Sequence, residues 1–221
     1  MVQIDRLIIA AAAAGMLASA ILPASISGEV IDRIAATVGH QVIAESQIGE
    51  EIRVTALLSQ KPPDWSDSNR TQTLNRLIDQ ALIQHEIEAT RFPEPPEEGL
   101  KLLDQLKTGN KDFETSIASY HLTDAIVARH LAWQVTFLRF VEYRFKPSID
   151  VSDADLRDFY ATQSEQWKKE GKPVPTFEDV RPDLERLLTS KYVDQALDRW
   201  LGDQRTETAI VIKDARKAAK Q

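Results

Sequence analysis

The histidines and acidic residues are the side chains of this protein that could perform metal or acid–base chemistry. His85 and Glu86 begin like the H-E-x-x-H motif of zinc proteases, but Ala89 stands where the second histidine is required. That motif binds zinc through two histidines one turn apart on the same helical face. The sequence therefore favours a place for His85 at the polar edge of an apolar helix face.

The motifs of other common enzyme classes are not found in the sequence. The remaining histidines, His40, His121 and His130, lack metal-ligand spacing, and the chain contains no cysteine. There is no Gly-x-Ser-x-Gly elbow and no glycine-rich phosphate loop. Asp153 and Asp155 fit helix capping better than acid–base catalysis. We therefore expect no enzyme activity, no metal and no cofactor.

Aromatic side chains are the stronger chemical signal, because they supply contact area for apolar ligands at low entropic cost. They concentrate on a helix that is predicted over residues 124–145, capped by Thr123 and stopped by Pro147. Two neighbouring faces of this helix are apolar: Ile126, His130, Trp133, Phe137, Phe140 and Val141 on one, and Val127, Leu131, Val135, Leu138 and Phe145 on the other. Together they are wider than the stripe of about 100° that a surface helix usually carries.

A helix with two apolar faces must be covered on both. Both covers can be helices of the same domain, in which case the aromatic side chains are core residues. Alternatively one cover is a ligand chain, because large apolar surface left open on a monomer usually marks a binding site. We predict a groove that holds extended apolar segments of other polypeptides, with these candidate peptide-binding residues: Trp133, Phe137, Phe140, Val141 and Ile126.

The beginning of the chain has the features of a secretory signal. Residues 1–27 are predicted to be a signal peptide, with a basic start at Arg6, an alanine-rich apolar run and small residues before Gly28. The run is short for a membrane helix, which needs about 20 apolar residues. We expect export to the periplasm and no stable membrane insertion after cleavage. Cleavage after Ala20 and an uncleaved anchor are the alternatives.

The composition limits the partners of the protein. The formal net charge is -7, which argues against general nucleic-acid binding. Without cysteine an exported protein has no disulfides, so its stability must come from packing. Residues 213–221 form a basic tail that we expect to be solvated, with contact to anionic lipid or another protein as the alternative.

The remaining elements are predicted from periodicity and from capping residues. Residues 29–43 alternate like a strand pair with Gly39 at the first position of a two-residue type II′ loop, and residues 208–212 are predicted to be its third strand. Helices are expected over residues 47–59 (capped by Ser46), 69–90, 97–107, 112–120, 153–167 (capped by Ser152) and from Thr176 or Asp179 to about 205. Pro182 is tolerable only in the first turn of the last helix.

Several of these segments, taken in order, resemble the SurA-type periplasmic chaperones. The similar segments are residues 31–43 with Ser46-Gln47-Ile48, residues 76–83 with Leu77-Ile78-Asp79, Leu122-Thr123, residues 151–156 with Tyr160, and residues 177–182 with Trp200-Leu201 and residues 210–212. The resemblance covers nearly the whole chain after the signal. It implies a helical peptide-binding domain that holds unfolded outer-membrane protein precursors without ATP.

The sequence departs from that family in two places. Members with isomerase activity insert a parvulin domain of about a hundred residues between the segments that match Tyr160 and Phe177. Only residues 161–176 lie there in this chain, so a prolyl isomerase label would describe its relatives. In addition, His121 stands where such proteins often have glycine before Leu-Thr.

We therefore predict a mostly helical, SurA-like peptide-binding domain with a small mixed β-element, formed by the N-terminal hairpin and the C-terminal strand. Residues 28–221 form one bipartite domain: residues 28–146 are the N-terminal helical part, 147–175 a bridging helix and loop in place of the parvulin insert, 176–212 the closing helix and strand, and 213–221 the tail. The expected partners are unfolded or extended polypeptides. A structural subunit with a fixed partner or a homodimer, and a prolyl isomerase by family label only, are the alternatives; the oligomeric state is left open.

Overall fold

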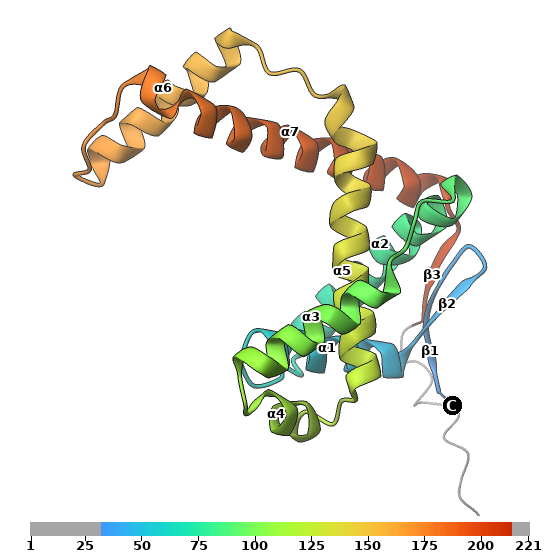
Figure 1. Ribbon diagram of the computed structural model, residues 1–221. Coiled ribbons are helices and arrows are strands. Elements are labelled where there is room, and N and C mark those ends of the chain that lie inside the picture. Colours follow the sequence, from blue (N-terminus) through green and yellow to red (C-terminus); the bar gives the residue numbers. More distant parts are fainter. Residues whose placement is uncertain (1–31, 214–221) are drawn as a thin grey trace, which may run out of the picture. The chain divides into compact units, whose positions relative to one another are not determined.

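The computed structural model describes residues 32–213 (Figure 1). The predicted signal peptide, its cleavage site and the first residues of the predicted strand pair lie outside the described residues. The same holds for the basic tail after Lys213.

Residues 32–213 are mostly helical and contain one small sheet. The elements are β1 (Ile34–Val38), β2 (Gln41–Ala44), α1 (Glu45–Leu58), α2 (Asp67–Thr90), α3 (Pro96–Gly109), α4 (Phe113–Ser119), α5 (Asp124–Phe145), a 3₁₀ turn (Lys146–Ser148), α6 (Asp153–Lys169), α7 (Phe177–Glu207) and β3 (Ile210–Ile212). The predicted mostly helical class with a small β-element from the two chain ends is confirmed. The prediction of a mixed sheet is wrong, because both strand pairs are antiparallel.

The sheet joins the beginning and the end of the described chain, with the strand order β2-β1-β3. Gly39 has φ +56, the positive value that the first position of a type II′ loop requires. Its N–H donates to the carbonyl of Ala209 at 2.9 Å, and the N–H of Lys213 donates to Ala35 at 2.8 Å. The inner face of the sheet packs on α2 in one cluster: Ala36, Val38 and Ile43 against Ile78, Ala81 and Leu82. This helix supplies the support that a short hairpin lacks on its own.

The start of α1 differs from the prediction that Ser46 caps it. Ala44 is the N-cap, and its N–H donates to Oε1 of Gln47 at 2.7 Å. Ser46 lies one position inside the helix, where its N–H donates to Oδ1 of Asp32 at 3.2 Å and its hydroxyl donates to the same carboxylate. The hydroxyl of Ser46 is the main reason why the pKa of Asp32 is lowered. A carboxylate from the residues before β1 therefore does the capping, which the positive end of the helix dipole favours.

The other predicted caps form as expected. The hydroxyls of Thr123, Ser152 and Thr176 each accept the backbone N–H of the residue three places later. Because α7 begins at Phe177, Pro182 lies in its second turn, so the prediction that it is restricted to the first turn is wrong. The carbonyl that lacks an N–H partner there belongs to Glu178, which is exposed and can bind water instead.

Helix α5 is covered by different helices along its length. Its first half packs with α1, α3 and α4 around Leu57, Leu103 and Phe113. Its second half packs with α2 and α7. Helices α3 and α5 cross (Figure 1). The crossing is unusually close, since a Cβ placed on Gly99 would lie 2.1 Å from the carbonyl oxygen of Ala128. Only glycine fits at that position without a shift of one helix.

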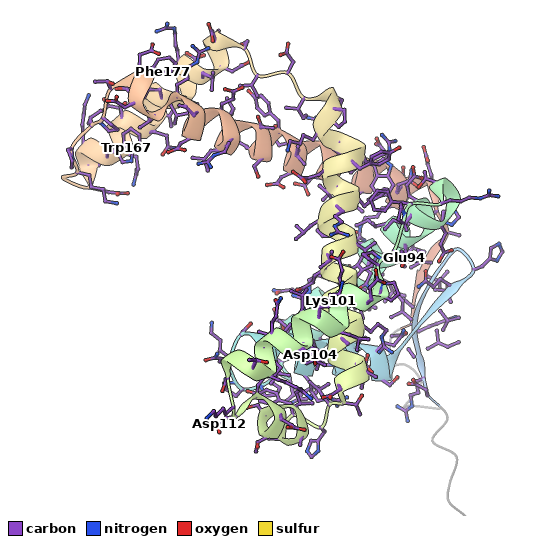
Figure 2. All side chains as sticks on the ribbon, in the orientation of Figure 1. Glu94, Lys101, Asp104, Asp112, Trp167 and Phe177 are labelled. Atoms are coloured by element: carbon purple, nitrogen blue, oxygen red, sulfur yellow. The ribbon has the colours of Figure 1, made fainter. Side chains whose placement is uncertain are left out.

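Helices α6 and α7 lie side by side over an apolar cluster of Leu156, Leu184 and Leu188. Figure 2 shows Trp167 and Phe177 on this helix pair; the ring of Tyr160 contacts both, at centroid distances of 6.4 and 5.4 Å. The Tyr160 hydroxyl donates to the carbonyl of Pro175 at 2.7 Å. Residues 161–176, which lie where isomerases of the resembled family insert the parvulin domain, form the second half of α6 and the connection to α7.

Candidate functional site

The side chain of Trp133 on α5 lies where three neighbouring cavities meet. Their volumes are about 830, 380 and 310 Å³, and all three are also lined by Gln80 of α2. We call the largest one the Trp133 groove. Its lining comes from five helices and strands and one connection: Gln41 and Ile43 of β2, Gln47 of α1, Leu77, Gln80, Ala81 and Gln84 of α2, Glu94, Pro96 and Leu100 of α3 and the connection before it, and Ala125, Ala128, Arg129, Ala132, Trp133 and Thr136 of α5.

The apolar part of the Trp133 groove follows from the packing of α5 on α3. Ala128 and Ala132 face Gly99 at the close crossing, and both also line the groove. Short side chains there leave space in front of α5, while Leu77 and Trp133 supply apolar area. Leu100 is 56% exposed and stands on the rim. The groove thus offers apolar contact surface that no other residue of the described chain covers.

Side-chain amides form much of the polar part of the groove. Glutamines line it from β2, α1 and α2. Gln47 is bonded to Ala44, and Gln84 donates to Glu94 at 3.3 Å. The side-chain amides of Gln41 and Gln80 make no hydrogen bond to any described residue. A free amide both donates and accepts hydrogen bonds, so it can pair with the peptide backbone of any sequence.

The charged residues that line the Trp133 groove balance one another. They are Arg129 of α5 and Glu94 of the connection between α2 and α3, which Figure 2 labels. The guanidinium of Arg129 is paired with Glu50 on α1. The lining carries one charge of each sign, and its guanidinium is already paired, so an anionic ligand segment would find no free cation to offset its desolvation. An uncharged segment suits the groove better than an anionic one.

His130 joins α5 to α1 beside the two smaller cavities. In the tautomer with a proton on Nδ1, it donates to Oε2 of Glu51 at 3.1 Å, and its Nε2 accepts from the Gln134 amide at 2.9 Å. Burial opposes the ionisation of Glu51. The hydrogen bond from His130 and the electrostatic attraction of His130 and Arg76 outweigh that effect and lower the pKa of Glu51.

Both ring nitrogens of His130 are thus engaged within the protein. This arrangement orients α5, and Trp133 with it, rather than presenting a free base to a substrate. In residues 32–213, no group of three or more histidine and acidic side chains is placed to hold a metal ion.

The structure separates the predicted binding residues into two groups. Trp133 lines all three cavities, Phe137 lines the smallest one with its ring centroid 6.2 Å from that of Trp133, and Ile126 lines the one of about 380 Å³. Phe140 and Val141 are only 0% and 7% exposed, in clusters with residues of α2 and α7. These two side chains have no surface for a ligand. Of the five predicted binding residues, only Trp133, Phe137 and Ile126 therefore belong to the candidate site.

Sequence reasoning missed most of the residues that face Trp133 across the groove. Leu77 and Ala81 have the four-residue spacing of an apolar helix face, but their position opposite α5 depends on tertiary packing. Gln41 and Ile43 belong to the predicted hairpin, and nothing local indicates that β2 borders a cavity. Among these groove residues, Leu100 could have been proposed from the sequence, because it lies three residues before Leu103 on the apolar face of the predicted helix.

Two further findings concern membranes and relatives. None of the helices in the described part of the chain is long and apolar enough to cross a membrane. No protein-family model matches the sequence, and no curated protein is found to be similar to it.

Proposed function

We propose that this protein is an ATP-independent chaperone of the SurA type, which binds unfolded or extended polypeptides in the periplasm. Outer-membrane protein precursors are the expected clients. The observation that carries the proposal is the Trp133 groove, which combines apolar area with free amides and balanced charge. Such a lining accepts apolar side chains together with the backbone that connects them.

Weak binding is sufficient for this function. Apolar burial contributes about 25 cal/mol per Å², and association costs about 4–15 kcal/mol. A few client side chains in a groove of this size therefore give exchangeable binding. A holding chaperone needs only that, provided that transfer of the client is faster than its aggregation.

The short segment between Tyr160 and Phe177 supports holding without isomerisation. Residues 161–176 form only the end of α6 and the connection to α7. Isomerases of the resembled family have a whole domain at this place in the chain. Prolyl isomerase activity remains the alternative that the family label alone would suggest. A proline-isomerisation assay on a short peptide tests it directly.

A fixed partner or a second copy of the chain is the other candidate. It is favoured by exposed apolar side chains on the sheet, Ile34, Val42 and Val211, which are 46–48% exposed. Light scattering of the purified protein over a dilution series separates the two functions. An obligate dimer keeps its mass on dilution, whereas a holding chaperone does not depend on self-association.

The test of the proposal is suppression of client aggregation. An unfolded outer-membrane β-barrel protein is diluted from urea, and its light scattering is recorded with and without the purified protein. We expect suppression near a stoichiometric ratio. No suppression at a large excess of the protein would refute the proposal.

Two matched variants locate the site. Leu100→Gln places an amide on the groove rim, whereas Leu138→Gln makes the same change on α5 at a residue that lines none of the three cavities. Both leucines are more than half exposed, at 56% and 63%, so neither change should disturb folding. We expect Leu100→Gln alone to weaken suppression.

A further inference from the structure

The outer edge of β2 borders the Trp133 groove. β2 is an edge strand, and within residues 32–213 no other strand pairs with its outer side. Its side chains Gln41 and Ile43 line the groove. An unpaired strand edge is a template for another extended chain. The groove is therefore bordered by main-chain N–H and C=O groups of a strand edge as well as by side chains.

The hydrogen bonds on the other side of the sheet show which backbone groups face this edge. Gly39 bonds to Ala209 and Lys213 bonds to Ala35, so Thr37, midway between, is the residue of β1 that exchanges bonds with Val211 of β3. The N–H and C=O of Thr37 are thus directed toward β3 and away from β2.

Val42 is the residue of β2 opposite Thr37. Hydrogen-bonded and non-hydrogen-bonded pairs alternate along an antiparallel ladder, so Thr37 and Val42 form a non-hydrogen-bonded pair. The N–H and C=O of Val42 consequently point outward, to the open edge. Ala44 is the next residue of β2 whose N–H points outward, and that N–H already donates to the side chain of Gln47. Val42 is therefore the one residue of β2 with both groups available.

Side chains along β2 alternate between two environments. Gln41 and Ile43 face the groove, whereas Val42 lies on the opposite face and is 48% exposed. A chain paired with this edge would place every second side chain in the groove and the others beside Val42. The balanced charge and free amides of the lining complement an uncharged segment.

We propose that an extended, uncharged segment of a client polypeptide adds to β2 as a further strand and exchanges backbone hydrogen bonds with Val42. Every second side chain of that segment enters the Trp133 groove. This inference rests on the proposed function and specifies its ligand: a segment with an apolar residue at every second position and no proline at the residue opposite Val42. Recognition of the backbone makes the site tolerant of client sequence.

Two proline variants test the edge. Val42→Pro removes the outward N–H of β2 and leaves the bonds to β1 intact, which is the situation in which an edge strand accepts proline. Ile212→Pro makes the same change at the outer edge of β3, because Ile212 follows Val211, the partner of Thr37, and so points outward. The probe is an end-capped ten-residue peptide that alternates Thr with Val and Tyr, labelled with a dye for fluorescence anisotropy.

We expect Val42→Pro to weaken peptide binding about three- to tenfold, the effect of losing one net hydrogen bond, and Ile212→Pro to leave it unchanged. Thermal unfolding checks that both variants fold. Amide hydrogen exchange by NMR on the unsubstituted protein gives a second measurement: the peptide should protect Val42 and leave Ile212 unprotected. A larger effect at Ile212, or an unprotected Val42 in the peptide-bound protein, would overturn strand addition at β2.

The outcomes distinguish this inference from the function on which it rests. If the peptide binds and Leu100→Gln weakens it, but Val42 is unaffected in both measurements, groove binding stands and strand addition is refuted. If the peptide does not bind, strand addition is refuted as well. If the protein also fails to suppress client aggregation, the chaperone proposal falls with it.

Discussion

Substitution of Gly99 by alanine should destabilise the protein, and the crossing of α3 and α5 sets the size of the effect. The added Cβ would lie 2.1 Å from the carbonyl oxygen of Ala128 and 2.8 Å from the Cβ of Ala132, where real contacts essentially never fall below 3.0 Å. The nearest atoms are backbone atoms and a Cβ, so no side-chain rotation relieves these contacts, and the helices must move apart by about 1 Å. Overpacking of this kind costs about 3 kcal/mol. The higher helix propensity of alanine returns about 1 kcal/mol, so the expected net loss is about 2 kcal/mol.

Gly202 of α7 is the matched control. A Cβ at that position meets nothing within 4 Å, so Gly202→Ala should stabilise the protein by about 0.5–1 kcal/mol. Urea unfolding, followed by circular dichroism and by tryptophan fluorescence, measures both variants against the unsubstituted protein. The two substitutions are chemically the same, so the opposite signs must come from the surroundings of each glycine.

The same variant links stability to the site. Pro96 and Leu100 on α3 and Ala128 and Ala132 on α5 all line the Trp133 groove, so separating the two helices should also weaken client binding. A Gly99→Ala protein as stable as Gly202→Ala would refute the close crossing. It would also remove the physical basis for the shape of the groove.

Two further substitutions test particular residues. His121 has φ +54, a conformation that costs a non-glycine residue about 1 kcal/mol; we expect His121→Gly to raise the thermal midpoint by about 2–4 °C, and a lower midpoint would contradict this account of the turn. The lowered pKa of Glu51 means that its ionised form stabilises the fold at pH values above the ordinary value of 4.5, and that this contribution is lost as the pH falls through the lowered pKa. Unfolding at a series of pH values should therefore show Glu51→Gln less stable than the unsubstituted protein by about 1 kcal/mol at pH 7, with a difference that shrinks below pH 4.5; a difference that does not change with pH would contradict it.

Much of the fold is encoded by short-range signals. Thr123, Ser152 and Thr176 cap the helices that follow them because the capping hydrogen bond joins residues three places apart. Gly39 makes the hairpin loop for an equally local reason, since glycine reaches positive φ without steric cost. Patterns of this kind do not depend on the rest of the chain, and they predicted the helices and strands in order.

Ser46 shows where the local rule fails. It has the residue type of an N-cap, but the sheet brings Asp32 to the same helix end, and a carboxylate binds there more strongly than a hydroxyl. The outcome is set by a residue that is distant from Ser46 in sequence. Local pattern could not have included it.

By itself, the sequence determined the helical class, the strands at the two ends, and an α5 whose apolar surface is too wide for one cover. Tertiary structure alone decided which part of that surface stays open. Trp133 and Phe140 lie on the same predicted face of α5, yet Trp133 borders a groove and Phe140 is fully buried by α2 and α7. The physical reason is that periodicity records which side chains avoid water, whereas the close approach of α3 at Gly99 and the edge of β2 determine where packing leaves space.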